Sequence, residues 1–160
     1  MKNYSLIALA ACIINSAIAN ATSSLQIDKL TCEYIENPLG IDTKIPRFNW
    51  TFKSTERNQF QSAYELIVSD NATDIQQQKG NMWSTGKITS SQNIQIEYGG
   101  KTLQSFTRYY WRVKVYNQNN EASLWSEISW FETSMLNTNG LPAGQAGWKA
   151  KWINDGSKNP

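Results

Sequence analysis

The amino-acid sequence predicts an all-β fold, an antiparallel sandwich of about seven strands that follows a signal peptide. Short segments in which apolar and polar residues alternate recur along the chain, and turn residues separate them. Segments with helical periodicity are missing. Seven Trp, seven Tyr and five Phe, against four Pro and nine Gly, supply enough large side chains to fill one core in a chain of 160 residues.

The first three strands are predicted in the first half of the chain. Residues 25–34 alternate and end at residues 37–40, where Pro and Gly favour a turn. Aromatic residues occupy every second position of the next strand, residues 47–52, and Pro46 stands at its entry, where a missing N–H does least harm. Alternation resumes in residues 63–69, the third strand.

The remaining strands follow a loop. Residues 70–82 are polar and rich in Gln, so a loop is predicted there, with two short strands at 83–88 and 93–98 behind it. The clearest alternation lies in residues 109–116, where Tyr, Trp and Val side chains occupy one face and Tyr, Arg and Lys the other. Residues 125–133 complete seven strands, which suits a sandwich of the immunoglobulin-like size.

The first 21 residues have the pattern of an export signal. A cationic start precedes an apolar run over residues 6–18, and small residues follow up to Ala21. The run is shorter than the ~20 apolar residues that cross a bilayer. We therefore expect export to the periplasm, the cell surface or the medium of a bacterium. In a second interpretation residues 9–12 form a lipoprotein box, and lipidated Cys12 attaches the protein to a membrane.

Under both interpretations Cys32 is the one free thiol, so no internal disulfide is predicted. Cys32 lies in an alternating run, and the sequence contains no His to activate it. It is interpreted as a small buried hydrophobic residue. Without His, His-based triads and imidazole zinc sites are excluded, and we expect neither a cofactor nor a metal.

The charge balance makes nucleic acid an unexpected partner, because 15 Lys and Arg face 13 Asp and Glu for a net charge of +2. The acidic residues are scattered, and no catalytic residue is predicted among them. Tyr110, Arg112 and Tyr116 form a candidate ligand face, since Tyr rings stack on sugars and guanidinium groups hold hydroxyls or carboxylates. The alternative is a solvated face whose aromatic and cationic side chains pair across strands.

Leu103, Thr107 and Tyr109 have the spacing of a tyrosine corner, in which the Tyr hydroxyl bonds to the upstream backbone. The motif resembles the fibronectin type III version, although that family usually has Pro where Ser105 stands. Residues 22–134 are accordingly predicted to form a fibronectin type III-like module. Composition changes after it, so residues 135–147 are interpreted as a linker and residues 148–160 as the truncated start of a second β-domain.

A wider resemblance rests on seven segments, which are residues 32–34, 36–42, 46–50, 61–64, 83–87, 108–113 and 125–127. Together they resemble the opening of bacterial α-L-rhamnosidases, the glycoside hydrolases that remove terminal rhamnose. The resemblance implies that a fibronectin-like sandwich comes first and that a segment similar to residues 150–153 opens the next β-domain. It also implies that the catalytic carboxylates lie in a helical toroid far downstream, so none is carried over to this chain.

The sequence therefore predicts the non-catalytic N-terminal accessory module of an exported α-L-rhamnosidase, a gene fragment or truncated reading frame that is inactive alone. By resemblance, the parent enzyme is an inverting hydrolase, and its downstream domains are the expected partners. One alternative is a stand-alone exported carbohydrate-binding or adhesion module with a polysaccharide partner. Another is a spacer that docks on its own enzyme.

Overall fold

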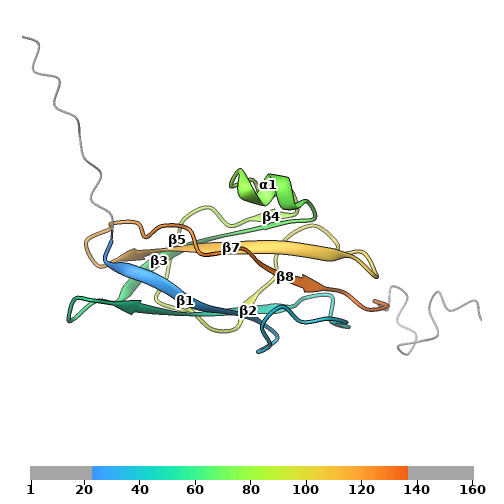
Figure 1. Ribbon diagram of the computed structural model, residues 1–160, viewed down its shortest axis with the longest axis horizontal. Coiled ribbons are helices and arrows are strands. Elements are labelled where there is room, and N and C mark those ends of the chain that lie inside the picture. Colours follow the sequence, from blue (N-terminus) through green and yellow to red (C-terminus); the bar gives the residue numbers. More distant parts are fainter. Residues whose placement is uncertain (1–22, 137–160) are drawn as a thin grey trace, which may run out of the picture.

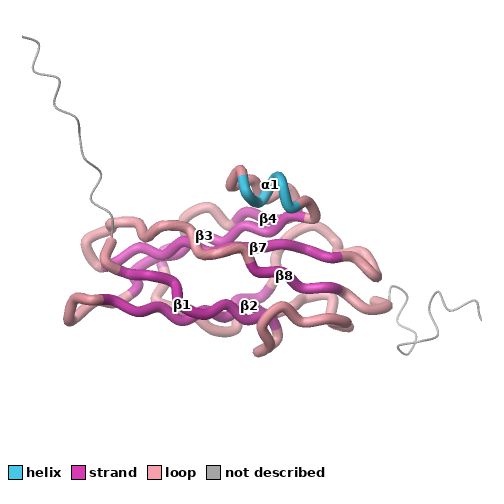
Figure 2. Tube along the Cα trace, viewed as in Figure 1, coloured by secondary structure: helices cyan, strands magenta, loops and turns pink. Residues whose placement is uncertain are grey.

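A computed structural model describes residues 23–136, which form two antiparallel β-layers with one short helix (Figures 1 and 2). The elements in chain order are β1 (Leu25–Cys32), β2 (Arg47–Ser54), β3 (Gln61–Ser69), α1 (Ala72–Gln76), β4 (Trp83–Ser84), β5 (Ile88–Thr89), β6 (Ile96–Glu97), β7 (Arg108–Asn117) and β8 (Ser129–Glu132). One sheet has the order β1-β2-β6 and the other the order β4-β3-β7-β8, with β5 also paired to β3. The predicted all-β antiparallel sandwich is confirmed.

Several sequence predictions fall on the rest of the chain. The leader at residues 1–21, Cys12, the segment at residues 148–160 and nearly all of the linker at residues 135–147 lie outside the described residues. Within the described part, no helix is long and apolar enough to cross a membrane.

The core lies between the two sheets and is mainly aromatic. In β7 every odd-numbered side chain is buried and the even-numbered ones are wholly or partly exposed, as the alternation predicts. From the opposite sheet, Phe48 of β2 is 0% exposed, and its ring centroid lies 4.7 Å from that of Trp111. Phe131 of β8 packs edge-on against Phe48 at 5.8 Å. This cluster joins β2 of one layer to β7 and β8 of the other.

A buried polar contact also joins the layers. The indole Nε1–H of Trp50 in β2 donates to Oε1 of Gln61 in β3 at 2.8 Å. The Gln61 amide then donates to the backbone carbonyls of Ser90 and Gln92 at 3.1 and 2.9 Å. Gln61 is only 2% exposed, so one side chain satisfies three polar groups from which water is largely excluded.

The predicted tyrosine-corner residues lie in the turn before β7 (Leu103 and Thr107) and at the start of the strand (Tyr109). The hydroxyl of Tyr109 accepts the backbone N–H of Gln104 at 2.7 Å, five residues upstream, which is the kind of contact that characterises a tyrosine corner. Leu103 is 4% exposed beside it in the core cluster. The Thr107 hydroxyl donates to the carbonyl of Ser105 at 3.1 Å, and this bond closes the turn into the strand.

The predicted loop at residues 70–82 contains α1, which corrects the sequence interpretation. Asn71 caps the helix by accepting the N–H groups of Thr73 and Asp74. Five helical residues are too few to show a periodic pattern, which is why the helix was missed. α1 packs on β3 and β7, and its Ile75 is buried, as is Ile67 of β3. β3 is therefore covered on both faces.

Three predicted strands are shorter than expected. The segment at 83–88 divides into β4 and β5 because Gly86 adopts a φ of 60° between them. In the segment at 93–98, Gln95 has a φ of 55°, so the alternation fails and Ile94 is 57% exposed while Ile96 is buried. Before β8, the hydroxyls of Ser123 and Ser126 accept the N–H groups of Val115 and Val113, which interrupts the regular strand ladder.

We predict that Gln61→Leu lowers the free energy of unfolding by about 2–4 kcal/mol, because it leaves the Trp50 indole and two carbonyls buried without partners. Chemical denaturation of the wild type and the variant measures this difference. Gln26→Leu, an exposed substitution on β1, is the control and should change stability little. Equal effects of the two substitutions would contradict the assignment of Gln61 as a link between the sheets.

Tyr109→Phe should cost about 1–2 kcal/mol, because the Gln104 N–H then loses its acceptor in a partly buried turn. Tyr110→Phe is the matched control, since Tyr110 is the next residue of β7 and lies on the partly exposed face. Thermal and denaturant unfolding of both variants test the contact. If Tyr109→Phe is as stable as the control, the corner hydroxyl does not stabilise the fold.

Candidate functional site

The predicted ligand face, made of Tyr110, Arg112 and Tyr116, lies on the outward side of β7. All three side chains are partly exposed, and Lys114 lies between the second and third in the strand. In register, Tyr110 is opposite Trp130 of β8 and Ser69 of β3. β7 therefore presents these three residues on one surface. Their contacts within the domain determine whether they are available to bind a ligand.

Arg112 is held by the segment that precedes β8. Its guanidinium Nε and Nη2 both donate to the backbone carbonyl of Ser126, at 3.1 and 2.8 Å. The Trp125 ring centroid lies 5.8 Å from the guanidinium carbon. Burial lowers the pKa of Arg112 from its ordinary value, although the group remains charged at neutral pH.

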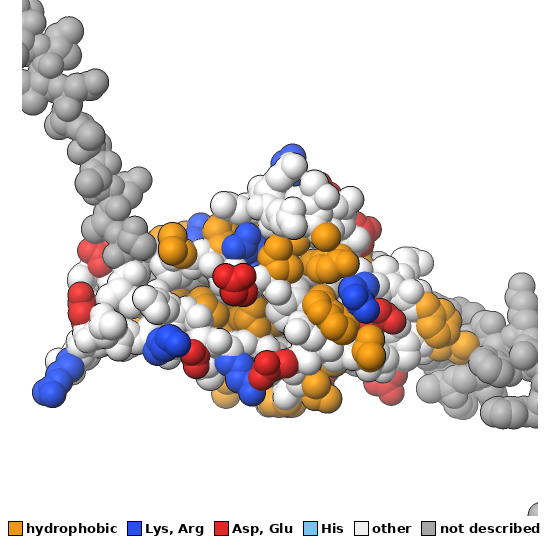
Figure 3. All heavy atoms as spheres, viewed as in Figure 1, with side chains coloured by type: hydrophobic (Ala, Val, Ile, Leu, Met, Phe, Trp, Pro, Cys, Tyr) orange, Lys and Arg blue, Asp and Glu red, His pale blue; other side chains and the backbone are white. Residues whose placement is uncertain are grey.

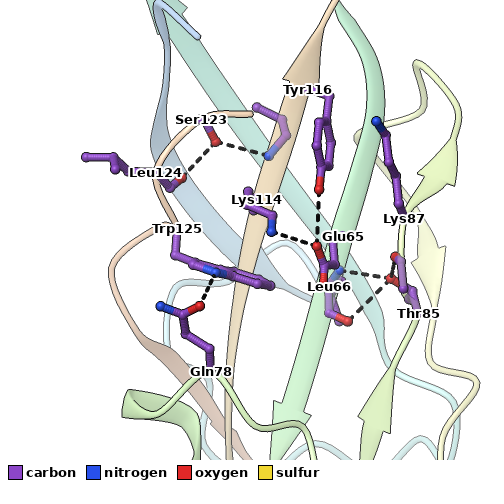
Figure 4. Close-up of polar contacts among 12 residues, drawn as sticks. Glu65, Leu66, Gln78, Thr85, Lys87, Lys114, Tyr116, Ser123, Leu124 and Trp125 are labelled. Atoms are coloured by element: carbon purple, nitrogen blue, oxygen red, sulfur yellow. Dashed lines mark hydrogen bonds and ion pairs between the residues drawn. The ribbon is translucent and has the colours of Figure 1, made fainter. Parts of the chain in front are cut away.

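Lys114 and Tyr116 meet Glu65 of β3 (Figure 4). The Lys114 ammonium lies 2.7 Å from the Glu65 carboxylate and 4.6 Å from the centroid of the Trp125 ring. The Tyr116 hydroxyl donates to the same carboxylate at 3.3 Å, and Lys87 lies 3.8 Å above the Tyr116 ring. Burial acts against the charged form of Lys114, but the hydrogen bond and the charge of Glu65 outweigh it and raise the pKa of Lys114.

This face consequently has the cross-strand pairing that the sequence analysis named as the alternative to a ligand site. At the end of the same strand, Arg108 pairs with Glu132 at 3.0 Å and stacks over Trp130 at 4.0 Å. Trp125 also donates from its indole nitrogen to Gln78, just after α1, at 3.0 Å. The sequence analysis did not assign Trp125 to this face, because its packing over β7 depends on the irregular segment before β8.

Cys32 lies at the end of β1 with 0% exposure and is a free thiol. Burial, with a smaller contribution from the Glu33 charge, raises the pKa of the thiol far above its ordinary value. A protonated, enclosed thiol is not a nucleophile. Its environment agrees with the interpretation of Cys32 as a buried hydrophobic residue. Within residues 23–136, no cluster of three His, Cys, Asp or Glu side chains could hold a metal ion.

A cavity of about 410 Å³ opens at the end of the sandwich where the described chain stops, and the sequence analysis did not predict it. Ile45, Tyr98, Leu103 and Leu136 line it together with the turn at residues 99–102. The turn is fixed because the Tyr98 hydroxyl donates to the carbonyl of Lys101 at 2.7 Å. A side chain at Gly100 would come within 2.5 Å of that hydroxyl, so glycine is required there.

The loop that carries Ile45 is closed at its base by Glu33 and Arg47. The Glu33 carboxylate accepts the Arg47 side chain at 3.1 and 2.7 Å and the Arg47 backbone N–H at 2.7 Å. The hydrogen bond from the Arg47 side chain is the main reason why the pKa of Glu33 lies below its ordinary value of 4.5, with burial opposing it. The pair therefore positions one wall of the cavity.

A second, wider groove of about 630 Å³ lies beside β4, β5 and β6. Tyr64 and Trp83 supply its aromatic surfaces, and Gln92, Gln95 and Glu97 supply polar groups. Part of this rim is already hydrogen-bonded within the domain. The Gln92 amide donates to the Ile94 carbonyl at 2.9 Å, and the Gln95 amide donates to the Tyr34 hydroxyl at 2.5 Å. The groove lining comes from β3, from the short strands β4, β5 and β6, and from the loop between β5 and β6, so no local motif predicts the groove.

Comparison with known proteins gives a consistent family assignment. The family model described as "Rha78A-like, N-terminal immunoglobulin domain" matches residues 27–137. An α-L-rhamnosidase of Formosa agariphila is 33% identical over 132 residues, which are 82% of this chain and 13% of that protein. The chain thus spans about an eighth of the length of the curated relatives it matches.

Solved structures show the same relation. The α-L-rhamnosidase of Dictyoglumus thermophilum superposes with a TM-score of 0.73 at 38% identity, covering 80% of this chain and 14% of that one. The Streptomyces avermitilis α-L-rhamnosidase in complex with L-rhamnose superposes with a TM-score of 0.72 at 33% identity, covering 81% and 12%. The immunoglobulin-like sandwich fold and the resemblance stated from the sequence are both confirmed.

The Glu33–Arg47 pair predicts a pH dependence of stability. Because the folded-state pKa of Glu33 is lowered, its contribution is present above about pH 4.5 and is lost as the pH falls through the folded value. Glu33→Gln should be less stable than the wild type near pH 7, and the difference should shrink near about pH 3.

Urea unfolding at the two pH values measures this difference. Glu36→Gln is the control, because Glu36 pairs with Lys29 through side chains that are 55–58% exposed, where ion pairs contribute little. A Glu33→Gln difference that stays constant with pH would contradict the role of the ionised carboxylate.

Proposed function

Because the chain belongs to the family of Rha78A-like N-terminal immunoglobulin domains, we propose that it serves as the non-catalytic N-terminal accessory module of an exported α-L-rhamnosidase. The observation that carries this role is the coverage. More than four fifths of the chain aligns with α-L-rhamnosidases, yet the alignment takes up only 12–13% of their length. The module would act by supporting the downstream domains, which are its proposed partners.

The chemistry of the described residues supports an accessory role. Five carboxylates pair with Lys or Arg side chains, and these are Asp28, Glu33, Glu36, Glu65 and Glu132. A glycosidase instead needs one carboxyl group that is kept protonated as an acid and another that acts as a base or nucleophile. Adjacent cations favour the ionised form and work against the acid role.

Export is part of the proposed role and is supported by the leader pattern of residues 1–21. Lipidation at Cys12 is the alternative route to the same compartment. Polysaccharide binding through Tyr110, Arg112 and Tyr116 has weaker support, since Arg112 and Tyr116 are engaged by Ser126 and Glu65 within the domain.

The role is tested first by an assay and by the gene. We expect the purified chain to release no detectable rhamnose from an aryl α-L-rhamnoside, because it contributes structure and not the acid and base carboxylates. We also expect the reading frame at the genomic locus to continue beyond codon 160 into a catalytic region. Rhamnose release by the isolated chain would contradict the accessory role. A stop codon directly after Pro160 would contradict the proposal that this chain is the N-terminal part of a longer enzyme.

A further inference from the structure

The groove beside β4, β5 and β6 has no part in the proposed function. It lies where the chain passes from one sheet to the other, between β4 and β5, which pair with β3, and β6, which pairs with β2. Each of these three strands has only two residues, so neither sheet extends far enough to close the gap. Its volume of about 630 Å³ falls within the ~300–1,000 Å³ that is usual for ligand sites.

The aromatic wall of the groove is held rigidly. The Trp83 ring packs edge-on against Tyr98 at 5.3 Å between centroids and lies 6.2 Å from the ring of Phe48. Trp83 nevertheless remains partly exposed. Tyr64 lies deeper, is 8% exposed, and packs edge-on against Trp50 at 5.1 Å. Because these rings are already fixed, a ligand that contacts them avoids the entropic cost of ordering mobile side chains.

The loop between β5 and β6, which carries part of the polar rim, is also held in place. Gln95 has a φ of 55°, a left-handed conformation that is uncommon for Gln, and its backbone N–H donates to Oδ1 of Asn49 at 2.8 Å. Asn49 is only 7% exposed. The Gln92 carbonyl accepts the amide of the buried Gln61 at 2.9 Å. Uncommon backbone conformations that the surrounding structure enforces cluster at functional sites.

The residues that line the groove carry little charge. On the face of the molecule shown in Figure 3, hydrophobic side chains lie among cationic and anionic ones. In the groove, Glu97 is the one charged residue among the described residues of the lining, and the others are aromatic, aliphatic, hydroxyl or amide side chains. A ligand anion therefore finds no cation there, whereas a neutral ligand with many hydroxyl groups finds both donors and acceptors.

We propose that this groove binds a neutral oligosaccharide, with one sugar ring stacked on Trp83 and its hydroxyl groups hydrogen-bonded to the rim. The apolar C–H face of a sugar ring suits an aromatic surface. Sugar hydroxyls donate to amide and carboxylate oxygens and accept from amide N–H groups, which Gln92, Gln95 and Glu97 supply. This binding goes beyond the proposed function. The candidate ligand face on β7 is separate, since none of its three residues lines the groove.

Titration of the full chain with hexasaccharides tests the proposal. Cellohexaose, xylohexaose and mannohexaose are the neutral probes, and hexagalacturonate is the anionic comparison. We expect at least one neutral probe to cause saturable NMR shifts at the Trp83 indole N–H and at the backbone amides of residues 92–97. Hexagalacturonate should leave these signals in place. The amides of residues 110–116, on β7, are the internal reference and should not shift.

Matched variants test the polar rim. Gln92 and Glu97 are exposed, so their side chains can be removed without opening the core. Gln92→Ala and Glu97→Ala should each raise the dissociation constant of the bound hexasaccharide by roughly fivefold or more, because each removes a hydrogen bond to the sugar. Gln26→Ala is the control, since Gln26 is an exposed residue of β1 that does not line the groove, and should leave the constant unchanged. The amide spectra verify that every variant is folded.

Three results would overturn the proposal. One is that no neutral hexasaccharide shifts the groove signals at millimolar concentration, or that the shifts fall on residues 110–116 instead. Another is that hexagalacturonate shifts the groove signals as strongly as the neutral probes. The third is that Gln92→Ala and Glu97→Ala bind as well as the control. None of these results depends on rhamnose release or on the reading frame beyond codon 160, so failure here is distinct from failure of the proposed function.

Discussion

The two sheets are held in register by the contact of Phe48 with Trp111 and by the hydrogen bond between Trp50 and Gln61. The first buries large aromatic area at the centre of the sandwich, and the second fixes which part of β2 faces which part of β3. An apolar contact alone tolerates sliding, whereas the hydrogen bond between the Trp50 indole and Gln61 forms in one register only. With both contacts in place, the odd-numbered side chains of β7 face the core and its even-numbered side chains face outward.

The contacts of the outward face of β7 come from residues of neighbouring segments, which the sequence pattern of β7 does not show. Tyr, Arg and Lys at alternating positions are compatible with a ligand platform and with a surface that pairs internally. Glu65 from β3 and Trp125 from the segment before β8 supply the partners for Lys114 and Tyr116. Most of the polar capacity of this face is therefore used within the domain.

The end of the sandwich near Leu136 has the opposite character. Loops from both sheets converge there and form hydrogen bonds with residues 132–136, while Leu39, Ile45 and Phe106 remain 54–70% exposed. A soluble domain rarely leaves such side chains together unless another surface covers them.

The alternation in the printed sequence was sufficient to determine the sandwich, the inward face of β7, the Leu103, Thr107 and Tyr109 spacing, and the buried state of Cys32. Period-two patterning and the spacing of the tyrosine corner are both local properties, so each of these can be derived from a short window of sequence. The family resemblance was also determined by local motifs. Tertiary structure alone decided the rest: α1 and its cover over Ile67, the division of β4 from β5, the pairing of Glu65 with Lys114, and the cavity beside Gly100. The helix α1 is too short to show a periodic pattern. The other features depend on residues far apart in the chain meeting in space, or on a single φ such as that of Gly86, and neither leaves a periodic signal in the sequence.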